Sequence, residues 1–179
     1  MQHTEIIDFW FKEIEKEKWF KKDESFDETL RTRFGQTHQM ATHCELAHWR
    51  QSPQGRLAEI IVLDQFSRNL YRGSGLAFAH DTLALALAQT AVAAGDDLEL
   101  EPEQRAFLYM PYMHSESAVI HQQALKLFDQ PGLENNYQYE LRHKEIIDRF
   151  GRYPHRNEVL GRNTTPEEAE FLKQPGSSF

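Results

Sequence analysis

The chain has 179 residues, a net charge of −8, a hydrophobic share of 40% and an aromatic share of 12%. This composition is that of a folded globular protein, and the acidic balance argues against general nucleic-acid binding. Cys44 is the single cysteine, so the chain forms no internal disulfide, which favours a reducing compartment. Neither a secretion signal nor a membrane-length apolar run is evident. We therefore expect one domain over residues 1–179, in the cytoplasm, without a membrane or nucleic-acid partner.

Apolar residues recur with helical spacing along the whole chain, and β-branched residues never alternate with polar ones over the length of a strand. The pattern predicts an all-α protein of about seven or eight helices, and the short turns between them favour antiparallel hairpins. The expected helices span about residues 4–15, 23–49, 53–72, 76–94, 102–110, 115–128 and 134–150, with a short last helix from 165.

Two helix starts carry clear capping signals. Ser52 precedes Pro53, which is typical of an N-cap followed by proline in the first helical turn. Thr165 is followed three positions later by Glu168, the pattern of a capping box. Both segments are therefore expected to begin helices.

Glycine and proline mark the expected helix ends. Gly151 should stop the helix before it, and Gly35 is a point where the second helix could break. Pro111 lacks a backbone donor and should end its helix at Met110. The tail over residues 174–179 is expected to be extended.

An acidic residue interrupts the apolar face of the helix expected over 53–72. Leu57 and Ile61 belong to that face, Asp64 falls on it, and Arg68 follows one turn later. Because a buried carboxylate needs a partner, we expect an ion pair between the two charged residues. Two interpretations remain, since the pair either pins neighbouring helices or faces a ligand.

His114 and Glu116 lie at the helix break that Pro111 predicts, where side chains can point away from the helical lattice. One interpretation is that Ser115 caps the next helix and Glu116 complements its dipole. The other is that His114 transfers protons at a site, because imidazole titrates near neutral pH.

His143 shares an apolar helix face with Ile146, Ile147 and Phe150, where a histidine is more often a core residue than a ligand. The candidate metal ligands are His114, Glu116, His121, His143 and His155. No metal-binding spacing connects them, and no nucleotide-binding or hydrolase motif is present. We therefore expect neither a metal nor a cofactor.

A loop rich in hydrogen-bond donors follows Gly151. It contains Arg152, His155, Arg156, Asn157 and Arg162. Helix capping would employ one or two of these side chains and leave the others unassigned. Guanidinium groups beside an imidazole suit carboxylate or phosphate, so the loop predicts binding of a small anionic molecule or an acidic peptide.

Several of these segments resemble the motifs of one bacterial family. They are Leu63–Asn69 with Arg72-Gly73, Ala77–Ala79 with Asp81, Phe107–Pro111 through Glu116, and Arg149–Arg152 through Asn157 with Leu160–Arg162. Together they resemble the family called domain of unknown function 924 over nearly the whole chain. The resemblance implies an all-helical fold of the tetratricopeptide-like superfamily, a right-handed α-superhelix, and brings no known activity, substrate or cofactor. Ser67 stands where many relatives have proline, which should ease the helix through that point.

The sequence leaves three functions open. The first is a binding protein for an anionic ligand, with contacts from Asp64, Arg68, Arg152, His155, Arg156 and Asn157. The second is an enzyme in which His114 or His143 transfers protons, Glu116 is the partner and two loop arginines hold the substrate. The third is a structural helical adaptor whose charged pairs only pin helices. We place the first in front.

Overall fold

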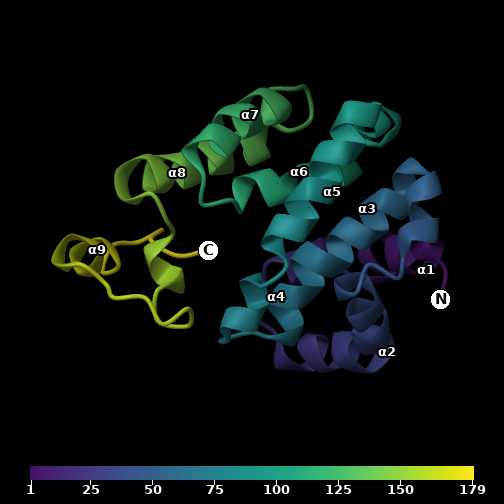
Figure 1. Ribbon diagram of the computed structural model, residues 1–179, viewed down its shortest axis with the longest axis horizontal. Coiled ribbons are helices and arrows are strands. Elements are labelled where there is room, and N and C mark those ends of the chain that lie inside the picture. Colours follow the sequence, from purple (N-terminus) through teal and green to yellow (C-terminus); the bar gives the residue numbers. More distant parts are fainter.

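The computed structural model describes residues 1–179 and is helical throughout, with no β-strand (Figure 1). The α-helices are α1 His3–Asp8, α2 Glu24–Thr42, α3 Pro53–Ile61, α4 Ser67–Leu70, α5 Asp81–Ala94, α6 Pro102–Met113, α7 Ala118–Phe128, α8 Glu134–Phe150 and α9 Pro166–Phe171. Short 3₁₀ turns cover Lys16–Trp19, Ala47–Gln51, Gly75–Phe78, Asp96–Glu99 and Pro154–Arg156, and π-turns cover Phe9–Glu13 and Val62–Phe66. The predicted all-α class is confirmed.

The two capping signals act as predicted. The Ser52 hydroxyl accepts a hydrogen bond from the backbone N–H of Gly55 at 3.1 Å and caps the start of α3. At α9, the Glu168 N–H donates to the Thr165 hydroxyl at 3.2 Å, and the Thr165 N–H donates to the Glu168 carboxylate at 2.8 Å. Gly151 ends α8 with a left-handed φ of 67°. These signals are readable from sequence because each involves residues within one turn.

Two expected interruptions do not occur. α2 continues through Gly35, and α6 continues through Pro111 to end at Met113. Pro111 removes one backbone hydrogen bond, but Tyr112 and Met113 beyond it are buried in the core. Burial of two large side chains stabilises the last turn by several kcal/mol, about 1.5–3 for each, which offsets the lost bond.

The start of α7 and the path of the tail also differ from expectation. Ser117 occupies the N-cap of α7, whereas the carbonyl oxygen of Ser115 accepts a hydrogen bond from His121. The tail is not extended. It turns at Gly176, where φ is 78°, and returns to place Phe179 on α8.

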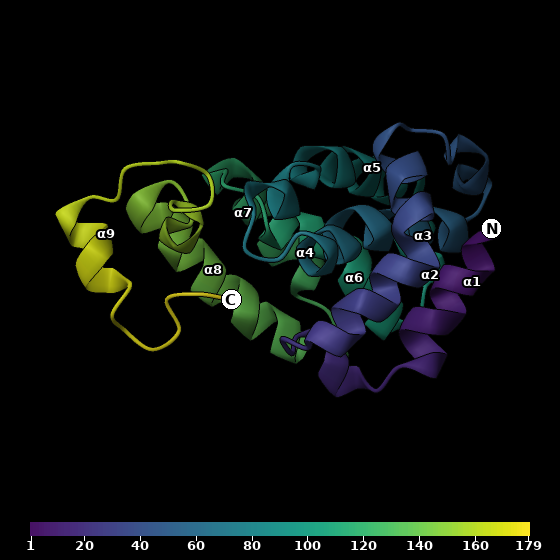
Figure 2. The same cartoon turned by 90° about the horizontal axis from the view of Figure 1, so that it is seen from below.

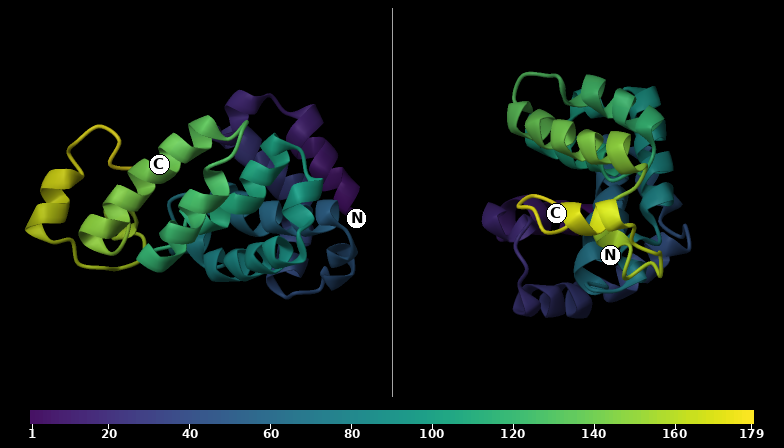
Figure 3. Two further views of the ribbon diagram at one scale, coloured as in Figure 1. Left: turned by 90° about the horizontal axis from the view of Figure 1, so that it is seen from above. Right: turned by 90° about the vertical axis from the view of Figure 1, so that its left-hand side faces the viewer.

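A large core holds the N-terminal three-quarters of the chain together. It is one cluster of 32 buried residues that extends along the sequence from Ile6 to Leu133. α3 lies inside it, with Leu57, Ile60 and Ile61 fully buried, and α1, α5 and α6 pack against α3 (Figure 1). Consecutive helices lie side by side, α5 with α6 and α7 with α8, as in a helical hairpin (Figure 3). The implied right-handed superhelix stays a prediction.

The C-terminal part has its own small apolar centre. This second cluster consists of Ile146, Ile147 and Tyr153, with Phe150 and Phe171 packed against it. α9 lies at one end of the molecule and the N-terminus at the other (Figure 2).

The stretch Gly75–Ala94, which contains α5, is long and apolar enough to cross a membrane by length and composition alone, with a mean hydropathy of 1.3. Mostly buried core helices of soluble proteins meet the same criterion, but only 22% of this stretch is buried. The expectation from sequence that no apolar run has membrane-spanning length is therefore wrong by this criterion. One face of α5 packs on the core through Ala84, Ala88 and Ala91, which have no exposed surface. These small side chains let α5 approach its neighbours closely.

Candidate functional site

Asp64 and Arg68 form an ion pair inside the protein, as the sequence predicts. The π-turn Val62–Phe66 carries Asp64 between α3 and α4, and the guanidinium of Arg68 lies 3.2 Å from its carboxylate. Burial opposes the charge of Asp64, but Arg68 and His114 hold the pKa of that carboxyl well below its usual range. π-turns within helices are frequent at functional sites, because they reorient one side chain relative to the helix.

Asp81 and Arg156 extend the pair into a polar cluster. Arg68 donates to the carboxylate of Asp81 at 2.9 and 3.0 Å. Arg156 donates to the same carboxylate at 3.3 Å and to the carbonyl oxygen of His114 at 3.1 Å. The two guanidinium groups, of Arg68 and Arg156, are thus balanced by the carboxylates of Asp64 and Asp81. We call these four residues and His114 the polar cluster.

His114 is the titratable imidazole of the polar cluster. Its Nδ1 lies 2.7 Å from the Asp64 carboxylate, which can only accept, so Nδ1 carries the proton and Nε2 keeps its lone pair. Nε2 has no partner within the protein and is not fully buried. Burial and the charge of Arg68 lower the pKa of His114, against the opposing effect of Asp64 and Asp81. A neutral imidazole with an open basic nitrogen results.

Glu116 is not the partner of His114, contrary to the expectation from sequence. Its carboxylate accepts hydrogen bonds from Arg162 at 2.7 and 2.9 Å and from the backbone N–H of Tyr153 at 2.7 Å. Burial opposes its charge, but these donors keep the pKa of Glu116 below its ordinary value. The carboxylate that orients His114 is instead Asp64, from a helix 50 positions earlier.

Most donors of the loop find acceptors inside the protein. Arg152 donates to both carboxylate oxygens of Glu168 at 2.7 and 2.9 Å, and Asn157 donates to the same group at 3.2 Å. The hydrogen bonds from Arg152 lower the pKa of Glu168 to about 2. Arg152, Asn157 and Arg162 therefore need no acceptor from outside the protein, contrary to the expectation from sequence. The sequence does not reveal the acceptors of these donors, because Glu116 comes from a distant segment and Glu168 from α9.

Two buried nitrogens of the loop remain without any partner, Nδ1 of His155 and Nε of Arg156. Arg156 is only 6% exposed. Burial, reinforced by the charge of Arg156, lowers the pKa of His155 to about 4, so its ring is neutral near pH 7. A buried polar group without a partner costs about 1–3 kcal/mol. A hydrogen-bond acceptor that reached the Nε–H of Arg156 would remove this cost, whereas Nδ1 of His155 can donate or accept according to its tautomer.

His143 lies beside the same loop and is covered by the tail. Its Nδ1 donates to the carbonyl oxygen of Tyr139 at 2.7 Å, and burial lowers its pKa to about 3. The ring of Phe179 stacks on it with centroids 3.7 Å apart, and Tyr153 meets it edge-on at 5.7 Å. His155 is 6.0 Å from Phe179. His143 and His155 therefore share an aromatic surface next to the polar cluster.

His121 forms a separate, fully buried pair with Glu140. Its Nδ1 is 2.7 Å from the Glu140 carboxylate, and its Nε2 is 2.8 Å from the carbonyl oxygen of Ser115. Burial raises the pKa of Glu140 although His121 opposes the shift. The pair ties α7 to α8. No three candidate ligands in the chain are grouped to hold a metal ion.

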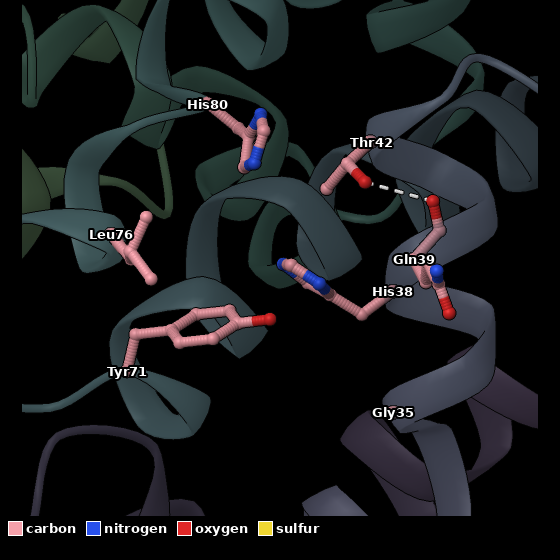
Figure 4. A pocket seen from close by; sticks show the side chains of 7 residues that line it. All are labelled: Gly35, His38, Gln39, Thr42, Tyr71, Leu76 and His80. Atoms are coloured by element: carbon pink, nitrogen blue, oxygen red, sulfur yellow. Dashed lines mark hydrogen bonds between the residues drawn. The ribbon is translucent and has the colours of Figure 1, made fainter.

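A cavity that the sequence did not reveal lies elsewhere, between α2 and the segment that leads to α5 (Figure 4). It measures about 250 Å³. It is lined by Gly35, His38, Gln39, Thr42, Tyr71, Leu76 and His80. The sequence does contain one sign of this cavity. The four lining residues from α2 are spaced by three or four positions, so they form one face of the helix, and that face carries no apolar side chain.

The chain matches the model of the family described as bacterial protein of unknown function (DUF924) over residues 6–176. It belongs to this family. The DUF924 chain is also similar to the solved structure of ATU0120, a protein of unknown function from Agrobacterium tumefaciens. The two share 38% sequence identity over 96% of each chain, with a TM-score of 0.90. No curated protein matches the sequence. Membership in the family brings no activity, so function has to be argued from the site.

Proposed function

We propose that this DUF924 protein binds a small anionic ligand, a carboxylate or a phosphate, beside His114, His155 and Arg156. The observation that carries the proposal is the pair of buried nitrogens without partners on His155 and Arg156. The guanidinium Nε–H can only donate a hydrogen bond. An anionic oxygen is the acceptor that such a donor binds most strongly.

The charge of the site limits what it can bind. The two guanidinium groups of the polar cluster are balanced by two carboxylates, so an added anion finds no surplus positive charge. His114 can supply it, because its free Nε2 accepts a proton and the ligand's charge would favour the protonated form. The ligand is therefore expected to bind together with a proton and to bind more weakly as pH rises.

The positions of the family motifs support the same binding site. Asp64, Arg68 and Asp81 come from the first half of the chain, whereas His114 and Arg156 come from two later motifs. All five lie in one cluster although they span 92 positions of sequence. A cluster that only pinned two helices would not need members from four segments.

The test is thermal unfolding in inorganic phosphate, acetate and citrate, at about pH 6 and about pH 8. At least one anion should raise the melting temperature, and more so at the lower pH. His155→Phe keeps an aromatic ring, removes the unpartnered nitrogen and should abolish the response. His48→Phe, at an exposed position, is the matched control and should respond like the parent. No response to any anion, or an unchanged response in His155→Phe, would overturn the proposal.

A second candidate is an enzyme in which His114 acts as a general base. The specific observation is the Asp64–His114 contact, since a carboxylate on Nδ1 fixes the tautomer and makes Nε2 a stronger base. The test is a panel of carboxylate and phosphate esters. Any turnover should disappear in His114→Gln, and anion binding through Arg156 should weaken and lose its dependence on pH. Turnover that survives this substitution would exclude His114 as the base.

A further inference from the structure

The cavity between α2 and the start of α5 is bordered by polar and aromatic side chains. Gly35, His38, Gln39 and Thr42 form one face of α2, and Tyr71 and His80 close the opposite side (Figure 4). It shares no lining residue with the polar cluster. Its volume of about 250 Å³ lies at the small end for ligand pockets, which suits a molecule of one or two rings.

The tautomer of His38 follows from its neighbours. The Ser67 hydroxyl lies 2.6 Å from the carbonyl oxygen of Leu63 and donates its proton there, because a carbonyl oxygen can only accept. His38 Nε2 lies 2.8 Å from the same hydroxyl oxygen and must therefore be the donor. Nδ1 of the neutral ring is left with a lone pair. Burial, with the charge of His80, lowers the pKa of His38 to about 4 and keeps the ring neutral.

The lining carries no permanent charge and is rich in flat groups. It combines two imidazoles, a phenol, an amide, a hydroxyl and one leucine. The centroid of the His38 ring lies 5.4 Å from that of Tyr71 and 6.0 Å from that of His80, so the three rings form one aromatic group in the lining. A charged ligand would lose hydration without meeting an opposite charge. A flat, uncharged ligand that donates a hydrogen bond matches these groups.

We propose that this cavity binds an uncharged nitrogen heterocycle of nucleobase size, with a ring N–H donated to Nδ1 of His38. In this proposal the faces of the ligand ring pack against Tyr71 and His80, which line the cavity. A phosphate group on the ligand is not accommodated, because no cation lines the cavity.

Gly35 allows the cavity to be closed without touching its polar groups. A Cβ atom built at Gly35 meets no heavy atom within 4 Å, so this lining position faces open space. Gly35→Met should fill the cavity, whereas Gly35→Ala adds one methyl group and leaves most of it open. The added Cβ contacts no other element, so both variants should keep α2 intact.

The experiment measures binding of uracil and adenine by calorimetry to the parent and both Gly35 variants. At least one base should bind the parent and Gly35→Ala, and Gly35→Met should lose at least about tenfold in affinity. 1,3-Dimethyluracil lacks both ring N–H groups, so it should not bind, and neither should uridine monophosphate. Equal binding of uracil and its dimethyl derivative would overturn the proposal. So would binding that survives in Gly35→Met, no binding of either base, or stoichiometric binding of Zn²⁺ at His38 and His80.

Discussion

The carboxylate of Asp64 orients the imidazole of His114 across 2.7 Å, although the two residues are 50 positions apart. Asp64 is fully buried, and Arg68 approaches the same carboxylate from the next helical turn. Arg68 and His114 thus share the single negative charge of the Asp64 carboxylate. Arg68 opposes protonation of His114, whereas Asp64 favours it, so removal of either residue should change the imidazole as well as the fold.

Asp64→Ala should destabilise the protein much more than Asp8→Ala. Removing Asp64 leaves Arg68 buried with part of its charge uncompensated, which costs about 3–5 kcal/mol. The side chain of Asp8 is 51% exposed and pairs only with Lys12, so its loss should change stability by no more than about 0.5 kcal/mol. Chemical denaturation of both variants measures the difference. Equal midpoints with equal slopes would contradict the buried pair.

Arg156→Ala should lower stability by more than about 1 kcal/mol, because Arg156 is buried and bonds to Asp81 and the His114 carbonyl oxygen. This reverses the expectation that sequence alone supports, in which the loop arginines are free for a ligand. Arg149→Ala is the control, since that side chain is 45% exposed and pairs with Glu167. A loss equal to that of Arg149→Ala would show that Arg156 contributes nothing to the fold.

Stability should fall in acid partly because buried histidines are neutral in the folded state and bind protons when the chain unfolds. Unfolded histidine titrates near about 6.5. The folded pKa is about 4 for His38 and about 3 for His143. Between the folded and the unfolded pKa values, the unfolded state therefore binds more protons than the folded state. The stability present above about pH 6.5 is lost as pH falls towards about 4. The loss is about 1.4 kcal/mol per pH unit for each histidine.

The matched variant is His143→Phe, which keeps a ring against Phe179 but removes the titrating group. Its unfolding free energy should depend on pH less steeply than that of the parent by about one proton between about pH 6 and about pH 4. Denaturant titrations at three pH values provide the slopes. Parallel pH dependences in the two proteins would mean that His143 is already charged in the folded state.

Gly55→Ala and Gly35→Ala should have opposite effects. A Cβ at Gly55 would lie 1.9 Å from the carbonyl oxygen of Trp49, so the start of α3 would have to move. Gly35 lies in the interior of α2 with open space around it, where alanine should stabilise the helix by about 0.5–1 kcal/mol. Melting temperatures of the two variants test this. A stabilised Gly55→Ala protein would contradict the close approach.

Purified protein should contain no stoichiometric transition metal, and a chelator should leave its melting temperature unchanged. The reason is the dispersal of the candidate ligands, since His121 is engaged by Glu140 and His143 by a backbone carbonyl. A structural metal would couple strongly to folding. Elemental analysis that finds about one zinc per chain would contradict this expectation.

Sequence reasoning succeeded where the interaction is local. The Ser52 and Thr165 caps and the Asp64–Arg68 pair each connect residues within four positions, so spacing alone predicts them. It failed for helix α6, because the burial that holds the chain beyond Pro111 depends on distant segments.

The site shows the same division between local and distant contacts. The motifs identified His114, Glu116 and the loop, and the structure gathers them in one region. The choice of partner was not readable, since Glu116 pairs with Arg162 and Asp64 with His114 across long sequence separations. The cavity at His38 was missed because its two sides are brought together only by the tertiary fold.

The small second apolar cluster has a consequence for motion. Beyond α8 the apolar attachments are few: Tyr153 in the small cluster, Phe171 packed against it and Phe179 stacked on α8. Other attachments are charged, such as Arg162 with Glu116 and Arg156 with Asp81. Such a segment should open as a unit at a lower free energy than the 32-residue core. Amide hydrogens of α9 should therefore exchange with solvent before those of α3, and an anion bound at Arg156 should slow that exchange by holding the segment shut.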